Sequence, residues 1–541
     1  IVAPWCYLVV RAQRGAGSPH TVAAWVFRVT AIALSFGFLG AKWWLLLRVV
    51  GDEPERYVGS SQSYGIALLI VLALGLLGSG LRFAQLARVV ADHPARLLAL
   101  SFGATGLFGA FALSLPLSMQ RVNELSFVDS LVMAFSAVCV TGLSVKTIAT
   151  TYTLFGQGVI CALVQIGGLG IMVLSAAIVM LSGQRMRVRS SAMLAEMVDS
   201  ESLSGLRRTV FAIVAYTLLI ELAGATILYQ RFLEIPEVRL ADGDPLAGPR
   251  SPEWAAVFHA VSAFCNAGMS NFEAGLAPLV DEPVILGTIT VLMVLGGIGF
   301  PVMDELLRQL GSRLLRRRPE RLSLHTRVVL VTSGILLAAM TFAYGLLEWS
   351  RSFAPLSFAE TLGAAIFQSA ATRSAGFNVV DVGAMRPATL MLTCLLMFIG
   401  GSPGSCAGGI KTTTLAVLFA GLRSELRGTP PRLFDRALRP ETIRRAMGVS
   451  FLSIGILSLG LFVLLLLEDH APLALAFEAF SAFTTTGLST GITADLGAPG
   501  KLLVAIMMYV GRIGPLTLAL ALSGKVPQAA VRLPEERVLI G

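Results

Sequence analysis

Four similar stretches of sequence decide the fold of this chain. The first reads Phe135-Ser-Ala-Val-Cys-Val-Thr-Gly142-Leu-Ser144, and the second reads Val261-Ser-Ala-Phe-Cys-Asn-Ala-Gly268-Met-Ser270. The fourth reads Phe480-Ser-Ala-Phe-Thr-Thr-Thr-Gly487-Leu-Ser489. The third, Gln368-Ser-Ala-Ala-Thr-Arg-Ser-Ala-Gly376-Phe-Asn378, has one extra residue before its glycine. A Ser-Ala pair therefore precedes a glycine four times, which indicates an internal fourfold repeat.

An apolar segment leads into each of these glycines, and each segment is too short to cross a bilayer. The segments lie near 128–139, 254–265, 358–370 and 474–484. About 12 helical residues extend only ~18 Å, whereas the hydrocarbon core is ~30 Å thick. We therefore expect each segment to enter the membrane as a short helix and to return through a glycine hairpin. Such backbone is tolerated only inside protein or beside a wet cavity.

The composition is that of a polytopic membrane protein. Of the 541 residues, 55% are hydrophobic and only 14% are charged, whereas soluble proteins carry about 25% charged residues. Together with the mean hydropathy of +0.76, this excludes a water-soluble enzyme, a disordered protein and a fibrous repeat. The net charge of +9 comes from basic residues in short loops between apolar runs, a pattern that sets membrane topology. We expect no nucleic-acid partner.

Ten apolar segments are long enough to span the membrane, and the loops between them give the orientation. The Arg-rich loops 183–208, 308–327 and 422–445 predict the cytoplasmic side, so ten spans place both termini in the cytoplasm. We expect the first span to be a retained helix, not a signal peptide. The chain begins at Ile1 without an initiator methionine, which leaves the completeness of the N-terminus open. The ten segments lie near 22–48, 64–91, 98–118, 153–182, 208–232, 283–310, 327–349, 386–421, 446–468 and 500–523.

Four glycine hairpins around one axis have a clear physical use. Glycine adopts backbone angles that other residues avoid, so carbonyl oxygens beside it can point toward the axis and replace the hydration shell of a cation. The short helices aim their termini at the same centre, where their dipoles bias which charge is tolerated. Close helix packing would explain one such glycine equally well. Four copies, each after a helix too short to span, favour a pore.

Two further segments, together with the hairpins, carry a family resemblance. They read Gly400-Gly-Ser-Pro-Gly-Ser-Cys-Ala-Gly-Gly-Ile-Lys-Thr-Thr-Thr414 and Gly511-Arg-Ile-Gly-Pro-Leu-Thr-Leu518. Over roughly residues 98–523 the chain resembles the Trk/Ktr/HKT superfamily of potassium transporters, which fold as four joined copies of a potassium-channel pore unit. Both segments match the Ktr branch, whereas two extra N-terminal helices are more like the Trk branch, so the branch stays open.

The resemblance implies an all-α polytopic membrane protein with four tandem helix–pore-loop–helix units around a central pore, plus two extra N-terminal helices. Its implied divisions are a two-helix extension at 1–97, pore unit 1 at 98–182, pore unit 2 at 183–310, pore unit 3 at 311–421 with a gate loop at 400–414, and pore unit 4 with a C-terminal tail at 422–541.

The resemblance also implies a selectivity filter made of backbone carbonyls. Gly142 stands where some sodium-preferring plant members carry serine, which favours potassium. Because main-chain atoms coordinate the ion, the sequence leaves the choice between K+ and Na+ open. The implied ion-binding residues are Val140, Thr141, Gly142, Asn266, Ala267, Gly268, Ser374, Ala375, Gly376, Thr485, Thr486 and Gly487.

A gate is implied below the filter. Glycines and Pro403 disfavour helix within the overlong segment 386–421, and the resemblance implies an intramembrane gate loop there; a simple kink is the alternative. Arg512 stands in an apolar run, and the resemblance implies that it opposes cation passage. Snorkelling toward an interface is the alternative. The implied gate residues are Gly400, Gly401, Ser402, Gly404, Gly408, Gly409, Lys411 and Arg512.

The remaining polar residues give no sign of a catalytic or metal site. The six cysteines form no CxxC pair and the five histidines are scattered, so we expect no cofactor. A membrane-embedded enzyme, the remote alternative, needs paired carboxylates or histidines, whereas Glu221 and Glu305 are isolated. Arg373 is expected to brace filter-loop carbonyls. Cys406 is expected to be a small apolar filler, with its response to oxidation left open.

Enzyme-like and nucleotide-like glycine motifs are explained by the membrane setting. Gly400–Gly404 and Gly487–Gly491 satisfy the G-x-S-x-G pattern of serine hydrolases, but Pro403 has no N–H to stabilise an oxyanion and no strand precedes either motif. The runs Gly167-Gly-Leu-Gly170 and Gly296-Gly-Ile-Gly299 are interpreted as packing glycines.

The sequence therefore predicts K+ uptake across the plasma membrane, in a bacterium the inner membrane. The membrane potential supplies about 2.3 kcal/mol per charge per 100 mV, so uptake needs no hydrolysis on this chain. The resemblance implies a homodimer on a cytoplasmic ring of nucleotide-binding regulatory subunits. The alternative is a sodium-permeable or Na+-coupled member, with Na+ as the coupling or activating ion.

Overall fold

The computed structural model describes residues 94–121, 125–170, 203–235, 251–314 and 321–514. The two predicted N-terminal spans, most of the loop 183–208 and the chain after residue 514 lie outside the described residues. The described part is almost entirely helical, as expected for an all-α membrane protein. Its only strands, β1 (Arg432–Leu433) and β2 (Arg436–Ala437), form a small antiparallel hairpin in which Leu433 pairs with Arg436.

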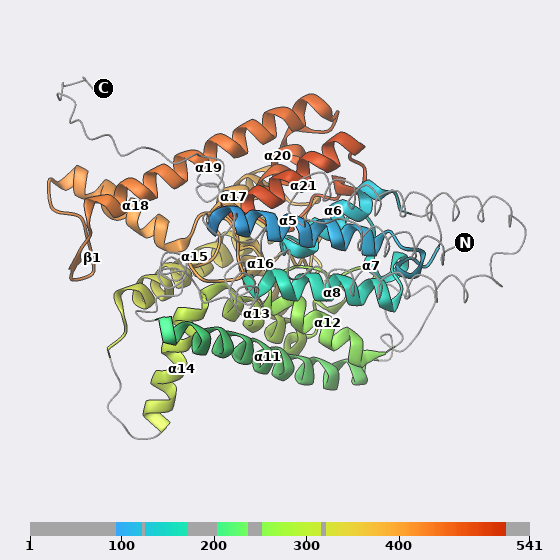
Figure 1. The fold of residues 1–541 in the computed structure, drawn as a ribbon, viewed down its shortest axis with the longest axis horizontal. Helices are drawn as coiled ribbons and strands as arrows, with labels where there is room; N and C mark the ends of the chain where they lie inside the picture. Colours follow the sequence, from blue (N-terminus) through green and yellow to red (C-terminus); the bar gives the residue numbers. More distant parts are fainter. Residues whose placement is uncertain (1–93, 122–124, 171–202, 236–250, 315–320, 515–541) are drawn as a thin grey trace, which may run out of the picture. The chain divides into compact units, whose positions relative to one another are not determined.

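The helices repeat in the order outer helix, pore helix, inner helix (Figure 1). The outer helices are α5 (Pro94–Leu113), α11 (Leu203–Glu234), α15 (Leu324–Glu348) and α19 (Pro440–Leu467). The pore helices are α6 (Phe127–Val138), α12 (Pro252–Phe264), α16 (Phe358–Thr372) and α20 (Pro472–Phe483). The inner helices are α8 (Leu154–Gly168), α13 (Pro283–Ile298), α17 (Pro387–Phe398) and α21 (Ala498–Ile513).

Local sequence signals fix where the short pore helices begin. Ser126 and Asp129 form a capping box at the start of α6, and Ser357 and Glu360 form another at the start of α16. A capping box satisfies two amide donors that a helix leaves unpaired in its first turn. Proline occupies the first turn of α12 and α20, where its missing N–H costs nothing. Each predicted short segment is therefore a well-delimited helix.

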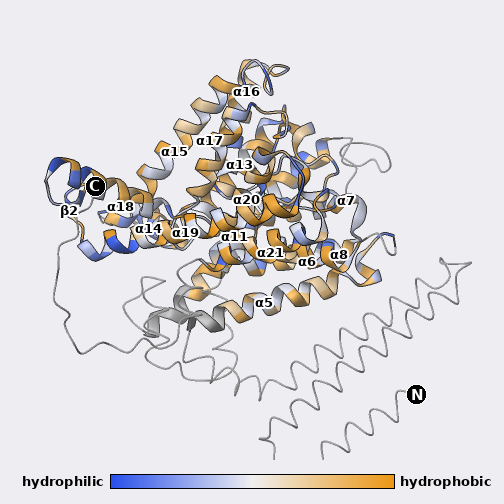
Figure 2. Cartoon of the chain, turned by 90° about the horizontal axis from the view of Figure 1, so that it is seen from above, coloured by the Kyte–Doolittle hydropathy of each residue, from blue (hydrophilic) through white to orange (hydrophobic). Residues whose placement is uncertain are grey.

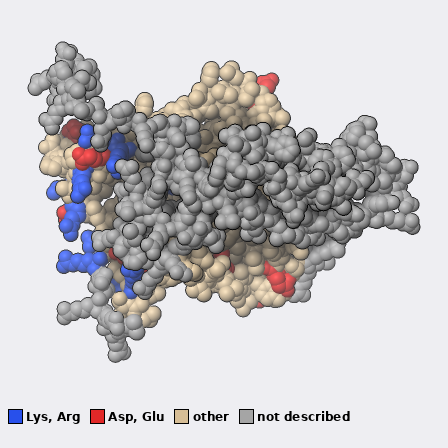
Figure 3. Space-filling model, in the orientation of Figure 1, with Lys and Arg blue, Asp and Glu red and all other residues tan. Residues whose placement is uncertain are grey.

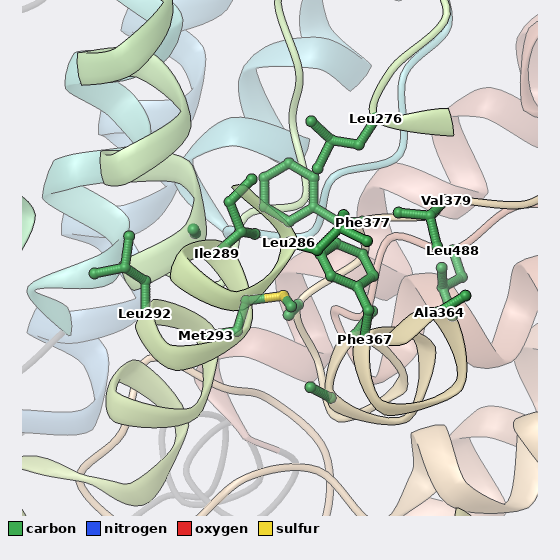
Figure 4. Packing of buried hydrophobic residues seen from close by; sticks show 14 of the residues in the cluster. Leu276, Leu286, Ile289, Leu292, Met293, Ala364, Phe367, Phe377, Val379 and Leu488 are labelled. Carbon is green, nitrogen blue, oxygen red and sulfur yellow. The ribbon is translucent and has the colours of Figure 1, made fainter. Parts of the chain in front are cut away.

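The units close into a ring through one recurring contact. Each inner helix packs against the pore helix of the next unit: α8 against α12, α13 against α16, α17 against α20, and α21 against α6. Figure 4 shows the contact between α13 and α16, where Met293 lies beside Phe367 and near Phe377 of the third hairpin. The last pair joins the end of the repeat to its beginning, so the four pore helices surround a common centre.

The inner helices are shorter than the sequence predicted. We expected continuous spans at 153–182, 283–310 and 500–523, but α8, α13 and α21 end at or just before Gly170, Gly299 and Gly514, whose φ angles are 81°, 91° and 88°. A positive φ cannot continue a right-handed helix. After Gly299 the chain bends by 108° into α14 (Phe300–Leu314).

Three described helices are long and apolar enough to cross a membrane, within α11, α15 and α19, and the bent pair of α13 and α14 makes a fourth candidate span. Figure 2 shows apolar residues along the described helices. Large side chains on the outer helices are exposed, including Leu219 at 63%, Ile335 at 63% and Phe451 at 82%. Such a surface suits contact with lipid chains.

Basic residues gather at one end of the described helices (Figure 3). They extend from the end of α18 (Thr412–Arg427) through the β1–β2 hairpin to the start of α19. This is the end that the Arg-rich loop 422–445 predicts to be cytoplasmic. The exposed arginines are Arg423, Arg427, Arg432, Arg436, Arg439, Arg444 and Arg445.

Candidate functional site

The predicted filter residues share an unusual backbone conformation. Positive φ is rare outside glycine and costs roughly 1–3 kcal/mol per residue, so it persists mainly where function requires it. Among the described residues only five non-glycine residues have it, and four of them open the predicted filter segments. These four are Val140, Asn266, Ser374 and Thr485, with φ of 55°, 59°, 69° and 50°. The glycine two positions later also has positive φ in every hairpin: Gly142, Gly268, Gly376 and Gly487.

The four hairpins meet in a closed ring of backbone contacts. A Cβ placed on Gly142 would lie 2.4 Å from the carbonyl oxygen of Ala267, and one on Gly268 would lie 2.6 Å from that of Ala375. A Cβ on Gly376 would lie 2.3 Å from the carbonyl oxygen of Thr486, and one on Gly487 would lie 1.9 Å from that of Thr141. In each hairpin the carbonyl of the residue before the glycine thus contacts the glycine of the preceding hairpin. The first and fourth hairpins make the same contact, which closes the ring. All twelve predicted filter residues are brought together.

Serine side chains hold three of the hairpins. The amide of Gly142 donates to Ser136 Oγ at 3.1 Å, and that of Gly487 donates to Ser481 Oγ at 3.0 Å. Ser262 Oγ accepts from the amide of Met269 at 2.9 Å. The Ser-Ala pair of the repeat contained this signal, but sequence reasoning did not assign it a role.

The third hairpin is supported differently, which accounts for its extra residue. Its repeat serine, Ser369, donates to the carbonyl of Leu337 on α15 at 2.9 Å, so it does not hold the glycine. The amide of Gly376 instead donates to the carbonyl of Ala371 at 3.1 Å. The added residue lengthens the end of α16, and the spacing from Ser374 to Gly376 matches the other hairpins.

Arg373 does not bond the filter carbonyls, and this expectation was wrong. Its guanidinium donates to Ser333 on α15, through Nη2 to the hydroxyl at 3.0 Å and through Nη1 to the carbonyl at 3.5 Å. Arg373 is the C-cap residue of α16, and these bonds direct its side chain toward the outer helix α15. It anchors the third hairpin from behind.

The segment between α17 and α18 is an extended loop, not a simple kink. Its ends are joined where the amide of Ile410 donates to the carbonyl of Phe398 at 3.0 Å. A Cβ on Gly400 would lie 1.9 Å from the carbonyl of Gly408, so two of the predicted gate glycines allow the loop to close on itself. Because α18 begins at Thr412, the loop ends earlier than the predicted 400–414, and from here on we refer to residues 399–411 as the gate loop.

The gate loop touches the filter directly. The amide of Gly408 donates to Ser374 Oγ at 2.9 Å, and the same hydroxyl donates to the carbonyl of Thr485 at 2.8 Å. A Cβ on Gly408 would lie 2.1 Å from Thr485 Oγ1, which explains why glycine is needed there. Ser374 therefore links the third and fourth hairpins to the gate loop, a role that its place in the filter sequence did not reveal.

The gate loop also contacts the inner helices of the other three units. Amides of Ser402 and Cys406 donate to the carbonyls of Gly297 and Gly296 at the end of α13, at 3.0 and 3.2 Å. Cys406 Sγ donates to the carbonyl of Gly168 on α8 at 2.9 Å. With Arg512 on α21 as the third contact, the loop is bonded to an inner helix of each of the other three units.

Arg512 joins the gate loop to two inner helices. Its guanidinium donates to the carbonyls of Cys406 in the gate loop and Gly167 at the end of α8. Arg512 therefore does not snorkel toward an interface. Lys411 Nζ donates to the carbonyl of Ala407 within the loop at 2.7 Å. Both cations lie on or beside the gate loop.

The repeated motif G-x-[Leu/Ile]-G has a role that sequence reasoning only half identified. Cβ atoms on Gly167, Gly296 and Gly511 would lie 2.1, 1.9 and 1.7 Å from carbonyls at the ends of the pore helices. These first glycines are packing glycines, as predicted for Gly167 and Gly296. The last glycine of each motif ends the helix. In the third of these motifs, Gly511-Arg-Ile-Gly514, Arg512 replaces the second glycine.

The two carboxylates singled out in the sequence have neutral partners. Glu221 accepts from Gln165 Nε2 at 3.1 Å, and Cys265 Sγ lies 3.7 Å from it. Glu305 accepts from the amide of Ser323 at 2.7 Å. In the described ranges no group of three or more His, Cys, Asp and Glu residues could hold a metal ion.

Comparison with known proteins identifies the family of this chain. The model of the TrkH family, described as cation transport protein, matches residues 105–533. The chain belongs to this family. It is 37% identical over 451 residues to the Ktr system potassium uptake protein B of Bacillus subtilis, covering 83% of this chain and 97% of that protein. It is 32% identical over 456 residues to the potassium/sodium uptake protein NtpJ of Enterococcus hirae, covering 83% and 97%.

A solved structure shares the fold. The potassium transporter TrkH from Vibrio parahaemolyticus superposes with a TM-score of 0.60 at 18% identity, over 88% of this chain and 98% of that one. At that identity the likeness concerns the fold alone. The family and its relatives make this chain a multi-pass membrane transporter of the Trk/Ktr superfamily, not an enzyme.

Proposed function

We propose that the chain takes up K+ across the plasma membrane through a carbonyl-lined filter formed by the four hairpins. The observation that carries the proposal is the closed ring in which each filter glycine abuts the carbonyl of the next hairpin. Four backbone strands, each with residues of alternating backbone handedness, present carbonyl oxygens to one axis. Such oxygens can replace the hydration shell of a cation. The ion-binding residues are the twelve predicted ones.

The gate loop and Arg512 close the pathway below that filter. The loop bonds to the filter through Ser374 and to the inner helices α8 and α13, and Arg512 bonds to it from α21. A guanidinium at this place repels a cation. Opening requires the loop to move and the hydrogen bonds of Arg512 to break, so the contacts that hold the loop set the cost of conduction.

A second candidate is permeation or coupling by Na+. NtpJ, at 32% identity, is named for both potassium and sodium uptake, whereas Gly142 favours potassium.

The domain division follows the repeat: an extension at 1–97, then four pore units. In the assembled transporter, two chains form a homodimer on a cytoplasmic ring of nucleotide-binding subunits. The arginines between α18 and α19 support the placement of that end at the cytoplasmic face of the inner membrane.

The test is cation flux in proteoliposomes that hold only this chain. K+ and Na+ are measured separately for the natural sequence and for Arg512→Ala. Potassium flux that rises in Arg512→Ala is the expected result. Sodium flux of equal size would favour the second candidate. The absence of flux of either ion, in both proteins, would contradict conduction by this chain alone.

A further inference from the structure

A small cavity lies beside the gate loop, where α18, α19 and α21 meet. Its volume is about 300 Å³, at the lower end for ligand pockets. The gate loop contributes Lys411, α21 contributes Arg512, and α18 and α19 contribute Thr414 and Ser453. We propose that this cavity binds a phosphate-type oxyanion that lowers the barrier to cation passage. The effect on flux rests on the proposed function of Arg512, whereas the binding itself does not.

The charge of the cavity carries the first part of the argument. Lys411 and Arg512 both line it, and no acidic residue does so among the described residues. Cations taken out of bulk water need a counter-charge or hydrogen-bond acceptors. The only described acceptors are the carbonyls of Ala407, Cys406 and Gly167. An ammonium has three donors and a guanidinium five, so both groups keep donors for a ligand.

The start of α18 carries the second, independent part. Lys411 is the N-cap of this 16-residue helix, and its side chain makes no capping hydrogen bond. The amide of Thr412 is satisfied by the carbonyl of Gly401 at 3.0 Å. In the described structure the amides of Thr413 and Thr414 have no partner. Free amides and the positive end of the helix dipole form a common site for phosphate groups, and Thr414 lines the cavity.

The chemistry favours an oxyanion over a small halide. Lysine, arginine, two amides and the hydroxyls of Thr414 and Ser453 offer several donors around one space, which suits a group with several acceptor oxygens. Two sources share this chemistry: free inorganic phosphate and the phosphodiester of an anionic lipid. A negative charge beside Arg512 would offset the repulsion that this residue exerts on a cation below the filter. A chain with the ligand bound in this cavity is therefore expected to conduct K+ faster.

The site can be imitated with one substitution. Thr414→Asp places a carboxylate in the first turn of α18, where an acidic residue is favoured, and its charge should occupy the place of the ligand. Thr414→Asn is the uncharged control of matched shape. Lys411→Gln removes one positive charge and keeps a donor for the carbonyl of Ala407. Arg439→Gln removes an exposed arginine that does not line the cavity.

Binding is measured first, by the melting temperature of the purified full chain in detergent. The probes are inorganic phosphate against potassium chloride of equal ionic strength, and a short-chain phosphatidylglycerol against the matching phosphatidylcholine. We expect a saturable rise in melting temperature with one of these probes for the natural chain, Thr414→Asn and Arg439→Gln. The rise should be absent in Thr414→Asp and require at least tenfold more ligand in Lys411→Gln. The probe that acts identifies the source.

Flux is the second readout. K+ flux is compared in vesicles of phosphatidylcholine with and without phosphatidylglycerol, and with and without phosphate on the cytoplasmic face. Several-fold stimulation that is lost in Thr414→Asp, because that variant is already fast, supports the regulatory effect. If neither probe shifts the melting temperature, or if both shift it equally in Thr414→Asp and Lys411→Gln, the site is refuted. If no K+ flux is found but the ligand still raises the melting temperature in a way that depends on these variants, the proposed function is refuted and the binding site stands.

Discussion

Lys501 Nζ lies 2.9 Å from Asp129 Oδ1 and ties the fourth repeat to the first. Lys501 is in the first turns of the inner helix α21, whereas Asp129 belongs to the capping box of the pore helix α6. The side chains are only 14% and 13% exposed. This ion pair lies at the contact that closes the ring, and its two residues are 372 positions apart in the sequence.

Asp129→Ala is expected to destabilise the protein by about 2 kcal/mol, because it leaves a mostly buried lysine unpaired and removes a helix cap. The measurement is the melting temperature in detergent. Glu441→Ala is the control, because its partner Arg444 is 3.3 Å away and both side chains are more than 60% exposed; such a pair contributes about 0–1 kcal/mol. Equal melting temperatures for the two variants would contradict the closing role of Asp129.

Gly376→Ala is expected to abolish K+ flux. The added Cβ would lie 2.3 Å from the carbonyl oxygen of Thr486, and the glycine has a φ of 73°, so the third and fourth hairpins must separate. Overpacking of this kind costs about 1–3 kcal/mol. Gly363→Ala on α16 is the control, because a Cβ there has no neighbour within 4 Å. Persisting K+ flux in Gly376→Ala would contradict a role of the ring of hairpins in conduction.

The fourfold repeat was predictable because short helices and glycines leave a period in the sequence. The predicted short segments match α6, α12, α16 and α20 to within two residues. The ends of the inner helices were not predictable in the same way, because an apolar run past Gly299 looks continuous whether the glycine packs or bends the chain. The φ of 91° at Gly299 in the structure shows that the helix ends there and the chain bends.

Side-chain partners in the site were the least accessible from sequence. Arg373 stands beside a filter strand in sequence, yet its side chain reaches Ser333 on another helix. Adjacency along the chain says nothing about the direction in which a side chain points from the end of a helix. Ser374 was placed in the filter for its backbone, whereas its hydroxyl joins the gate loop to the fourth hairpin. Both contacts depend on tertiary packing between units.

Ser481→Ala tests whether the repeat serine controls ion choice. The amide of Gly487 loses its acceptor at 3.0 Å, a loss of about 1 kcal/mol, so the fourth hairpin is held less firmly. A filter that adapts its oxygen positions discriminates less between ions of different size. We expect the ratio of K+ to Na+ flux to fall several-fold while K+ flux persists. Ser369→Ala is the matched control, because that hydroxyl bonds to Leu337 on α15 and does not hold a filter glycine. An equal fall in both variants would assign the effect to general loosening of the pore helices, and no fall in Ser481→Ala would remove the serine from ion selection.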